Sequence, residues 1–137
     1  MANLSVTEAL VTSDNSLQTY RSYETDVAIT AGQVVAEDPA TGNLILANAT
    51  TSDLANMVGI ALTSSTGAGK FIVVAERGLY VAGATLVAGT YYCVSATNGS
   101  LAPFSDLTTG QFATYAIVAE TTTQARVLPY ITEIAVA

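Results

Sequence analysis

The sequence predicts an all-β protein: a β-sandwich or barrel built from two pseudo-repeated β units, with an extended arm at its N-terminus. Apolar residues recur in short runs rich in β-branched and aromatic types, turn-forming residues separate the runs, and the second half repeats the pattern of the first. We expect an arm over residues 1–27 and a single β domain over residues 28–137, with repeats at about 28–82 and 83–137.

Each apolar run is bounded by Gly, Asn, Asp, Ser or Pro, which favour turns. The turns "PATGNL", around Gly42, and "ATNGSL", around Gly99, place Asn and Gly where a hairpin requires positive φ. The runs predict strands near residues 26–36, 43–47, 57–63, 70–76, 78–82, 86–95, 100–104, 112–120, 124–128 and 130–136.

An internal duplication emerges when "AGQVVAEDPATGNLILANATTSDLANMVGIALTSS", from Ala31, is laid over "AGTYYCVSATNGSLAPFSDLTTGQFATYAIVAETT", from Ala88. The offset is 57 residues (88 − 31 = 57), and the second copy is shorter where the first carries "STGAGK". Identities fall at turn glycines and apolar strand positions, where equivalent units should agree. Neither unit could bury its apolar face alone, so we expect the two to pack together. The identical pairs are Ala31/Ala88, Gly32/Gly89, Gly42/Gly99, Leu44/Leu101, Thr51/Thr108 and Ile60/Ile117.

The N-terminal residues stand outside the duplication. The segment "LSVTEALVTSDNSLQTYRSYETD" has patchy periodicity and many Thr, Ser and Asn residues, which fit an extended chain, although "VTEAL" could begin a helix after Ser5. We interpret it as an arm that docks on a neighbouring molecule; the alternative is an edge strand that pairs with the domain. The residues expected at a capsid or oligomer interface are Leu4, Val6, Leu10, Val11, Tyr20, Arg21 and Tyr23.

The composition favours assembly with other proteins. Apolar residues make up 50% of the chain and charged residues 11%, and the mean hydropathy is +0.45, so some apolar surface should meet a partner. No apolar run approaches the roughly 20 residues that span a bilayer, and the first residues lack the basic region of a secretory signal. We expect neither a membrane partner nor export by that route. The net charge of −7 disfavours nucleic acid.

No pattern predicts catalytic, cofactor-binding or metal-binding residues. The chain has no histidine, and its one cysteine, Cys93, lies in an alternating run and should be buried. The loop "STGAGK" looks like a phosphate-binding loop, but Ser64 stands where a glycine is needed and Phe71 where a hydroxyl should follow Lys70. A strand, not a helix, is predicted next. We therefore expect a hairpin connection there and a protein that is not an enzyme.

Two carboxylate pairs keep an enzymatic alternative open. Glu24 and Asp26 alternate along the chain and could converge on a cation or act as acid and base, and Glu37 adjoins Asp38. Both pairs lie at turn-like ends, where solvated carboxylates are the default. The alternative is a small hydrolase or metal-dependent enzyme.

Tyrosine and arginine are the candidate contact residues. Tyr91 and Tyr92 point to opposite faces of a predicted strand, so one should be core and the other available to a partner. Arg21, Arg77 and Arg126 are candidates for carboxylate pairs across an interface, although a solvated surface position is the commoner explanation.

The stretch "VGIALTSSTGAGKFIVVAERGLYVAGATLVAGTYYCVSATNGSLA", from Val58 to Ala102, resembles bacteriophage virion proteins. In capsid cement or head decoration proteins, and in related head-fibre and tail-fibre modules, a "VGIAL" strand leads into a Gly/Ala turn. A "G-x-x" strand start and an "AG-x-x-YY" strand follow. The match covers about a third of the chain closely.

The resemblance implies a structural virion protein, made in the host cytoplasm, on the exterior of the capsid. It would bind the major capsid protein as a homo-oligomer, often a trimer, and stabilise the capsid lattice. The family has no catalytic motif to carry over. The alternative within the resemblance is a head- or tail-fibre adhesin that binds a host surface receptor or glycan, and an oligomeric β domain with no phage connection is a further one.

Overall fold

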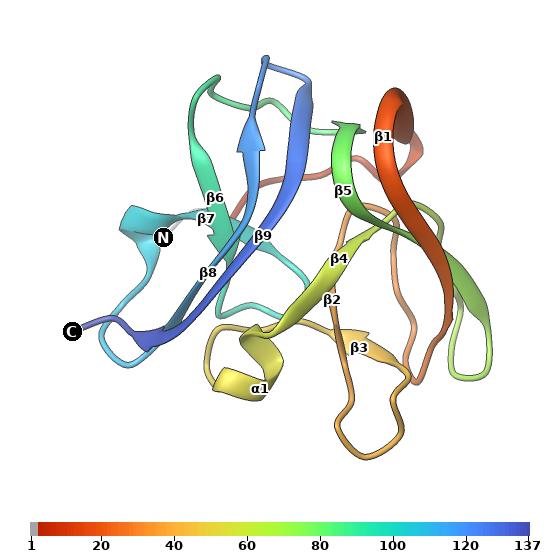
Figure 1. Cartoon of the computed structure of the whole chain (residues 1–137), viewed down its shortest axis with the longest axis horizontal. Coiled ribbons are helices and arrows are strands. Elements are labelled where there is room, and N and C mark those ends of the chain that lie inside the picture. The colour runs from red at the N-terminus through yellow and green to blue at the C-terminus, as the bar shows by residue number, and fades with distance from the viewer. Residues whose placement is uncertain (1–2) are drawn as a thin grey trace.

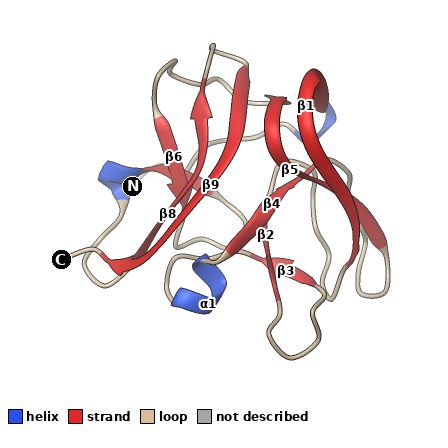
Figure 2. Cartoon of the chain, in the orientation of Figure 1, coloured by secondary structure: helices blue, strands red, loops and turns tan. Residues whose placement is uncertain are grey.

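The protein is built almost entirely of β-strands (Figure 1 and Figure 2). The computed structural model describes residues 3–137, apart from the side chains of residues 14–18. Its strands are β1 (Val11–Glu24), β2 (Val34–Glu37), β3 (Leu44–Leu46), β4 (Met57–Ala61), β5 (Phe71–Ala82), β6 (Tyr91–Val94), β7 (Leu101–Pro103), β8 (Phe112–Ala119) and β9 (Gln124–Ala135). The helical elements are the 3-10 turns η1 (Glu8–Leu10) and η2 (Phe104–Asp106) and the one-turn helix α1 (Ser52–Ala55). The predicted all-β class is confirmed.

The strands form one antiparallel sheet in the order β3-β2-β4-β5-β9-β8-β6-β7, with β1 alongside β5. Read outward from the centre, each side has the same succession: β4, β2 and β3 on one, β8, β6 and β7 on the other. The sheet curls, so its two halves face each other (Figure 1). Hydrogen bonds join them: Val34 N donates to Gly99 O at 3.0 Å, and Phe112 N donates to Ala49 O at 2.7 Å. The curled sheet forms a half-barrel.

The two units share the hairpin register that the duplication implies. Residues of β2 and β3 pair in the same way as the residues 57 positions later in β6 and β7: Val35–Leu46, Ala36–Ile45 and Glu37–Leu44 in the first unit, and Tyr92–Pro103, Cys93–Ala102 and Val94–Leu101 in the second. The side chains that face the main core do not follow the 57-residue offset. Val34 of β2 and Tyr92 of β6 both face this core, and they are 58 residues apart (92 − 34 = 58). The repeat is therefore kept in the backbone pairing, while each unit turns different residues inward.

Two strands continue through residues where the sequence predicted a break. Strand β5 passes through Arg77 and Gly78, and Gly78 takes a φ of 106°. Strand β9 passes through Pro129. By contrast, the predicted strands over 26–36 and 86–95 are shorter in the structure, as β2 and β6. The remaining residues of those two ranges are loops and turns apart from isolated bridge positions.

Most of the segment predicted as an N-terminal arm is a strand that pairs with the domain, as the edge-strand alternative expected. Strand β1 pairs with β5 from Val11, opposite Ala82, to Glu24, opposite Phe71. Most residues of β5 that pair with β4 or β9 also pair with β1. A strand has two edges, so β4 and β9 lie along one edge of β5 and β1 lies along the other. Its consecutive residues Thr19 to Ser22 are all exposed, which suits a strand at the edge of a sheet. The helix that "VTEAL" could have begun is only the 3-10 turn η1.

Buried side chains form three clusters. The main core lies between the two units and contains Val34, Ile60, Tyr80, Tyr92 and Val127 among others. A second cluster lies within the first unit, where a bridge between Thr25 and Leu44 brings the end of β1 to β3. It contains Ile29, Val35, Leu44, Ala61, Ile72 and Val74. A small third cluster joins Ala49 of the first unit to Cys93, Leu107 and Ala113 of the second.

Candidate interaction surfaces

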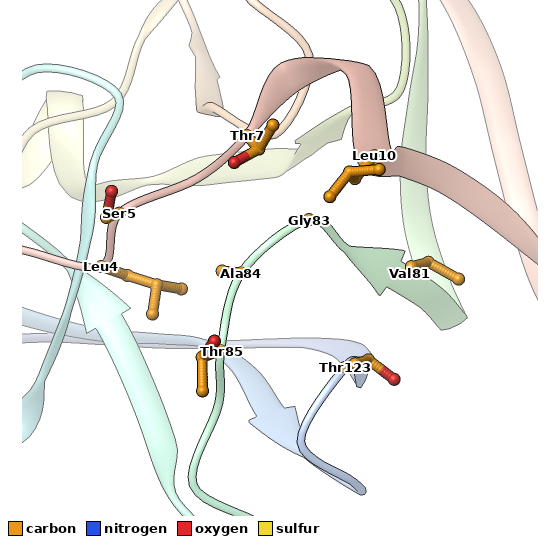
Figure 3. A pocket seen from close by; sticks show the side chains of 9 residues that line it. All are labelled: Leu4, Ser5, Thr7, Leu10, Val81, Gly83, Ala84, Thr85 and Thr123. Atoms are coloured by element: carbon orange, nitrogen blue, oxygen red, sulfur yellow. The ribbon is translucent and has the colours of Figure 1, made fainter.

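The first candidate surface is a hollow beside the N-terminal segment (Figure 3). It encloses about 580 Å³ between residues 4–10, the end of β5 and the β8–β9 turn. Thr7 N donates to Gly83 O at 2.7 Å, and a Cβ at Gly83 would lie 2.6 Å from Thr7 O, so the segment approaches as closely as a glycine permits. The lining is uncharged and suits apolar contact: Leu4, Ser5, Thr7, Leu10, Val81, Gly83, Ala84, Thr85 and Thr123.

The seven residues predicted at an interface do not share one surface. Leu4 and Val6 are half-buried against the main core, and Val11 belongs to it. Leu10 borders the hollow and is 58% exposed, whereas Tyr20 lies on β1 and is 61% exposed. Part of the predicted set therefore anchors the segment to its own domain, because these apolar residues complete the core.

Arg21 and Tyr23, the remaining two, converge on Glu76 of β5. The Arg21 Nε and Nη2 atoms donate to the two carboxylate oxygens of Glu76 at 2.9 and 3.0 Å, and the Tyr23 hydroxyl donates to the same carboxylate. Burial and this hydrogen bond raise the pKa of Tyr23 to about 12. The hydrogen bond from Arg21 holds the pKa of Glu76 below its ordinary value. The carboxylate partner of Arg21 is thus within the chain, where it fastens β1 to β5.

The second candidate surface, which we call the aromatic groove, lies on the second unit. It is lined by Tyr91, Tyr115, Leu128, Pro129 and Tyr130 and holds about 530 Å³. The Tyr115 ring is central: its centroid is 5.9 Å from that of Tyr91 at 83°, and 6.2 Å from that of Tyr130 at 44°. Phe104 stacks on Tyr115 from η2, with centroids 5.7 Å apart. Tyr91 and Tyr130 are 53% and 66% exposed.

Strand pairing assembles the groove from three neighbouring strands, β6, β8 and β9 (Figure 1). Tyr115 pairs directly with Tyr130, and it also pairs with Cys93, two residues after Tyr91. Alternation sends Tyr92 into the main core at 4% exposure and leaves Tyr91 outside, as predicted. Phe104, Tyr115 and Tyr130 were not predicted as contact residues. The signal available for them was an aromatic residue in three of the later apolar runs, those over 100–104, 112–120 and 130–136.

The predicted carboxylate pairs lie where strands end: Glu24 and Glu37 are the last residues of β1 and β2, and Asp26 and Asp38 lie in the loops that follow. Asp26 accepts hydrogen bonds from Thr41 Oγ1 at 2.5 Å and Asn43 Nδ2 at 3.1 Å, which hold the pKa of Asp26 below its ordinary value. Asp38 Oδ1 accepts from Ala40 N at 2.9 Å within its own turn. Among the side chains that the structure describes, no group of three or more His, Cys, Asp and Glu is placed to hold a metal ion.

The loop "STGAGK" and Cys93 take structural positions. A strand, β5, follows the loop, and Thr25 binds the loop backbone: Thr25 N donates to Lys70 O at 2.8 Å and Gly69 N donates to Thr25 O at 2.8 Å. The loop is the predicted connection between antiparallel strands. Burial raises the pKa of the Cys93 thiol to about 12, so the thiol is protonated and unreactive near neutral pH.

Comparison with known proteins finds no match: no family model, no curated protein and no solved structure matches the chain. In the described part of the chain, no helix has the length and apolar character to cross a membrane.

Proposed function

We propose that the protein is a structural virion protein, a decoration or cement protein that binds the major capsid protein on the outside of a phage head as a homo-oligomer. The observation that carries the proposal is the aromatic groove, because exposed aromatic rings held on a sheet are typical of surfaces that other proteins bury. The resemblance of Val58–Ala102 to phage virion proteins supplies the capsid as the partner.

The proposed mechanism is mechanical. Apolar surface buried across capsid subunits contributes about 25 cal/mol per Å², and the same contact repeats over a symmetric shell. Many modest contacts then stabilise the shell through avidity. The net charge of −7 suits the face of the capsid that is turned away from DNA.

Co-sedimentation tests this proposal. Heads assembled without the protein are mixed with the purified chain, and the bound ratio and the temperature of head rupture are measured. We expect binding that saturates at a fixed ratio to capsid subunits and a higher rupture temperature. A chain that stays in the supernatant with intact heads at every concentration would contradict the proposal.

The second candidate is a head- or tail-fibre adhesin that binds a host receptor or glycan. The exposed tyrosines favour it, because aromatic rings also form platforms for sugars. A glycan array and binding to host cells test it, and specific binding to cells without binding to heads would favour this role over decoration.

A further inference from the structure

The two units differ in what covers their strands. In the first unit, Ile72 and Val74 of β5 face the second cluster and are 1% and 0% exposed, since Ile29 and side chains of β2, β3 and β4 close that side. In the second unit, Leu128 and Tyr130 of β9 face away from the main core and are 39% and 66% exposed. Among the described residues, β9 has no additional partner strand that corresponds to β1 beside β5. The aromatic groove lies on the face of the second unit where Leu128 and Tyr130 are exposed.

The size of this uncovered surface favours a short segment over a second globular domain. With roughly 200 Å² for an aromatic side chain and the exposed fractions above, the groove and Phe104 present on the order of 400–500 Å². A stable interface between globular proteins needs about 800 Å² from each partner. A short segment that lies along the rings buries only about the area that the groove presents.

The free edge of β9 is unsuitable for backbone pairing with a strand of a partner protein. The ladder between β9 and β5 ends at Val127, so the following residues of β9 present an edge. That edge contains Pro129, which has no N–H to donate, and Glu133, whose φ of 56° departs from strand geometry. A segment that binds here must bind through side-chain contacts.

We propose that the aromatic groove binds a proline-containing, extended segment of a partner protein. Tyr91 and Tyr115 stand at 83° to each other, and Tyr130 closes the far side, so the rings form a notch with apolar walls. Proline rings stack well against such walls. The polyproline II backbone has no internal hydrogen bonds, so its carbonyls are free to accept from tyrosine hydroxyls. It also needs no strand partner.

Charge selects among such segments. The groove lining carries no charged side chain, whereas the whole chain carries a net charge of −7. A cationic segment is therefore attracted towards the surface, and an acidic one is repelled. We expect Lys or Arg to flank the prolines of the partner segment. This inference does not depend on the proposed capsid partner, since the same groove would read such a segment on any protein.

The test is a titration of the full chain with a labelled decaproline peptide that carries one arginine at each end. Fluorescence anisotropy measures affinity, and NMR shifts of the tyrosine rings locate the contact. A glycine-serine peptide with the same termini and a series of soluble oligosaccharides serve as comparison ligands. We expect the proline peptide alone to bind, with tighter binding at low salt.

Two substitutions locate the site. Tyr130→Ala should weaken binding at least about fivefold, as for a central aromatic contact, and Tyr130→Phe should weaken it less because the ring remains. Tyr20→Ala is the matched control, since Tyr20 is 61% exposed but lies on β1, and it should leave affinity unchanged. Circular dichroism confirms that each variant is folded.

The inference is overturned if the proline peptide does not bind at millimolar concentration, if Tyr20→Ala and Tyr130→Ala weaken binding equally, or if oligosaccharides displace the peptide from the groove. Self-association of the chain that requires Tyr130 would also overturn it, because the groove would then be an interface between copies. Heads are absent from this experiment, so its failure is distinct from failure of the capsid proposal.

Discussion

At the scale of single residues, the hydroxyl of Tyr23 is the contact most open to a direct test. It donates to Glu76, whose other partner is Arg21, and the Arg21 Cζ atom lies 5.6 Å from the centre of the Tyr23 ring. We predict that Tyr23→Phe lowers the free energy of unfolding by about 1–2 kcal/mol at pH 7, because a hydrogen bond to a carboxylate is lost. Urea unfolding measures the difference.

The sign of the pH dependence follows from the two shifted pKa values. The pKa of Glu76 is lowered, so its stabilising contribution is present above its ordinary value of 4.5 and is lost as pH falls through the lowered pKa. The pKa of Tyr23 is raised from 10.0 to about 12, so its contribution is present below pH 10 and is lost between pH 10 and 12. The wild type and Tyr23→Phe should therefore converge at both extremes. Tyr20→Phe is the control, and an equal loss in both variants would contradict the prediction.

Single residues also show why the groove was only partly predicted. Tyr91 could be identified because Tyr92 follows it, and two adjacent residues on a strand must face opposite ways. Tyr115 and Tyr130 lie in different apolar runs, and only the pairing of β8 with β9 places them side by side. Pairing between runs depends on the whole sheet, and local periodicity carries no information about it.

At the scale of elements, the docking of the N-terminal segment depends on Gly83. Its φ is 67°, and an added Cβ would lie 2.6 Å from Thr7 O and 2.9 Å from Val11 Cγ2. We predict that Gly83→Ala destabilises the protein by about 2 kcal/mol or more, since backbone strain and a steric clash combine. It should also release the segment before β1, and limited proteolysis within residues 3–10 detects that release.

Gly89→Ala provides the matched control. Gly89 has a similar φ of 83°, but an added Cβ would meet nothing within 4 Å. We expect it to cost only the backbone strain, about 1 kcal/mol, without new cleavage near the N-terminus. If Gly83→Ala behaves like Gly89→Ala, the N-terminal segment is not held by this close approach.

Elements were predictable where their turns carry a local signal. The hairpins β2–β3 and β6–β7 follow from turns at Gly42 and Gly99, both of which have positive φ. Strand β1 was not among the predicted strands because its exposed residues, such as those from Thr19 to Ser22, show no alternation of apolar and polar types. Strand β5 was divided at Arg77 in the prediction, although pairing of Arg77 with β1 and of Gly78 with β1 and β9 keeps the strand continuous there.

At the scale of the whole molecule, the duplication predicts that the two units fold only together. Hydrogen bonds cross between them, including Gly99 N to Ala47 O at 2.9 Å, and the main core draws side chains from both. A unit alone would expose large buried side chains such as Tyr92, Ile117 and Val127. Each loses about 1.5–3 kcal/mol of burial, and a few such losses exceed the stability of a typical domain.

We therefore predict that residues 83–137 expressed alone give the poorly dispersed NMR spectrum of an unfolded chain, and that adding residues 1–82 restores the dispersed spectrum. The control separates the effect of chain cleavage from that of losing the partner unit. A protease site inserted between Ala88 and Gly89, in the loop that joins β5 to β6, should be cut with the two parts remaining associated and folded. Both residues are exposed, so the insertion displaces little of the core. A folded spectrum from residues 83–137 alone would show that the second unit is an independent domain, and the shared core would then be an interface between two domains.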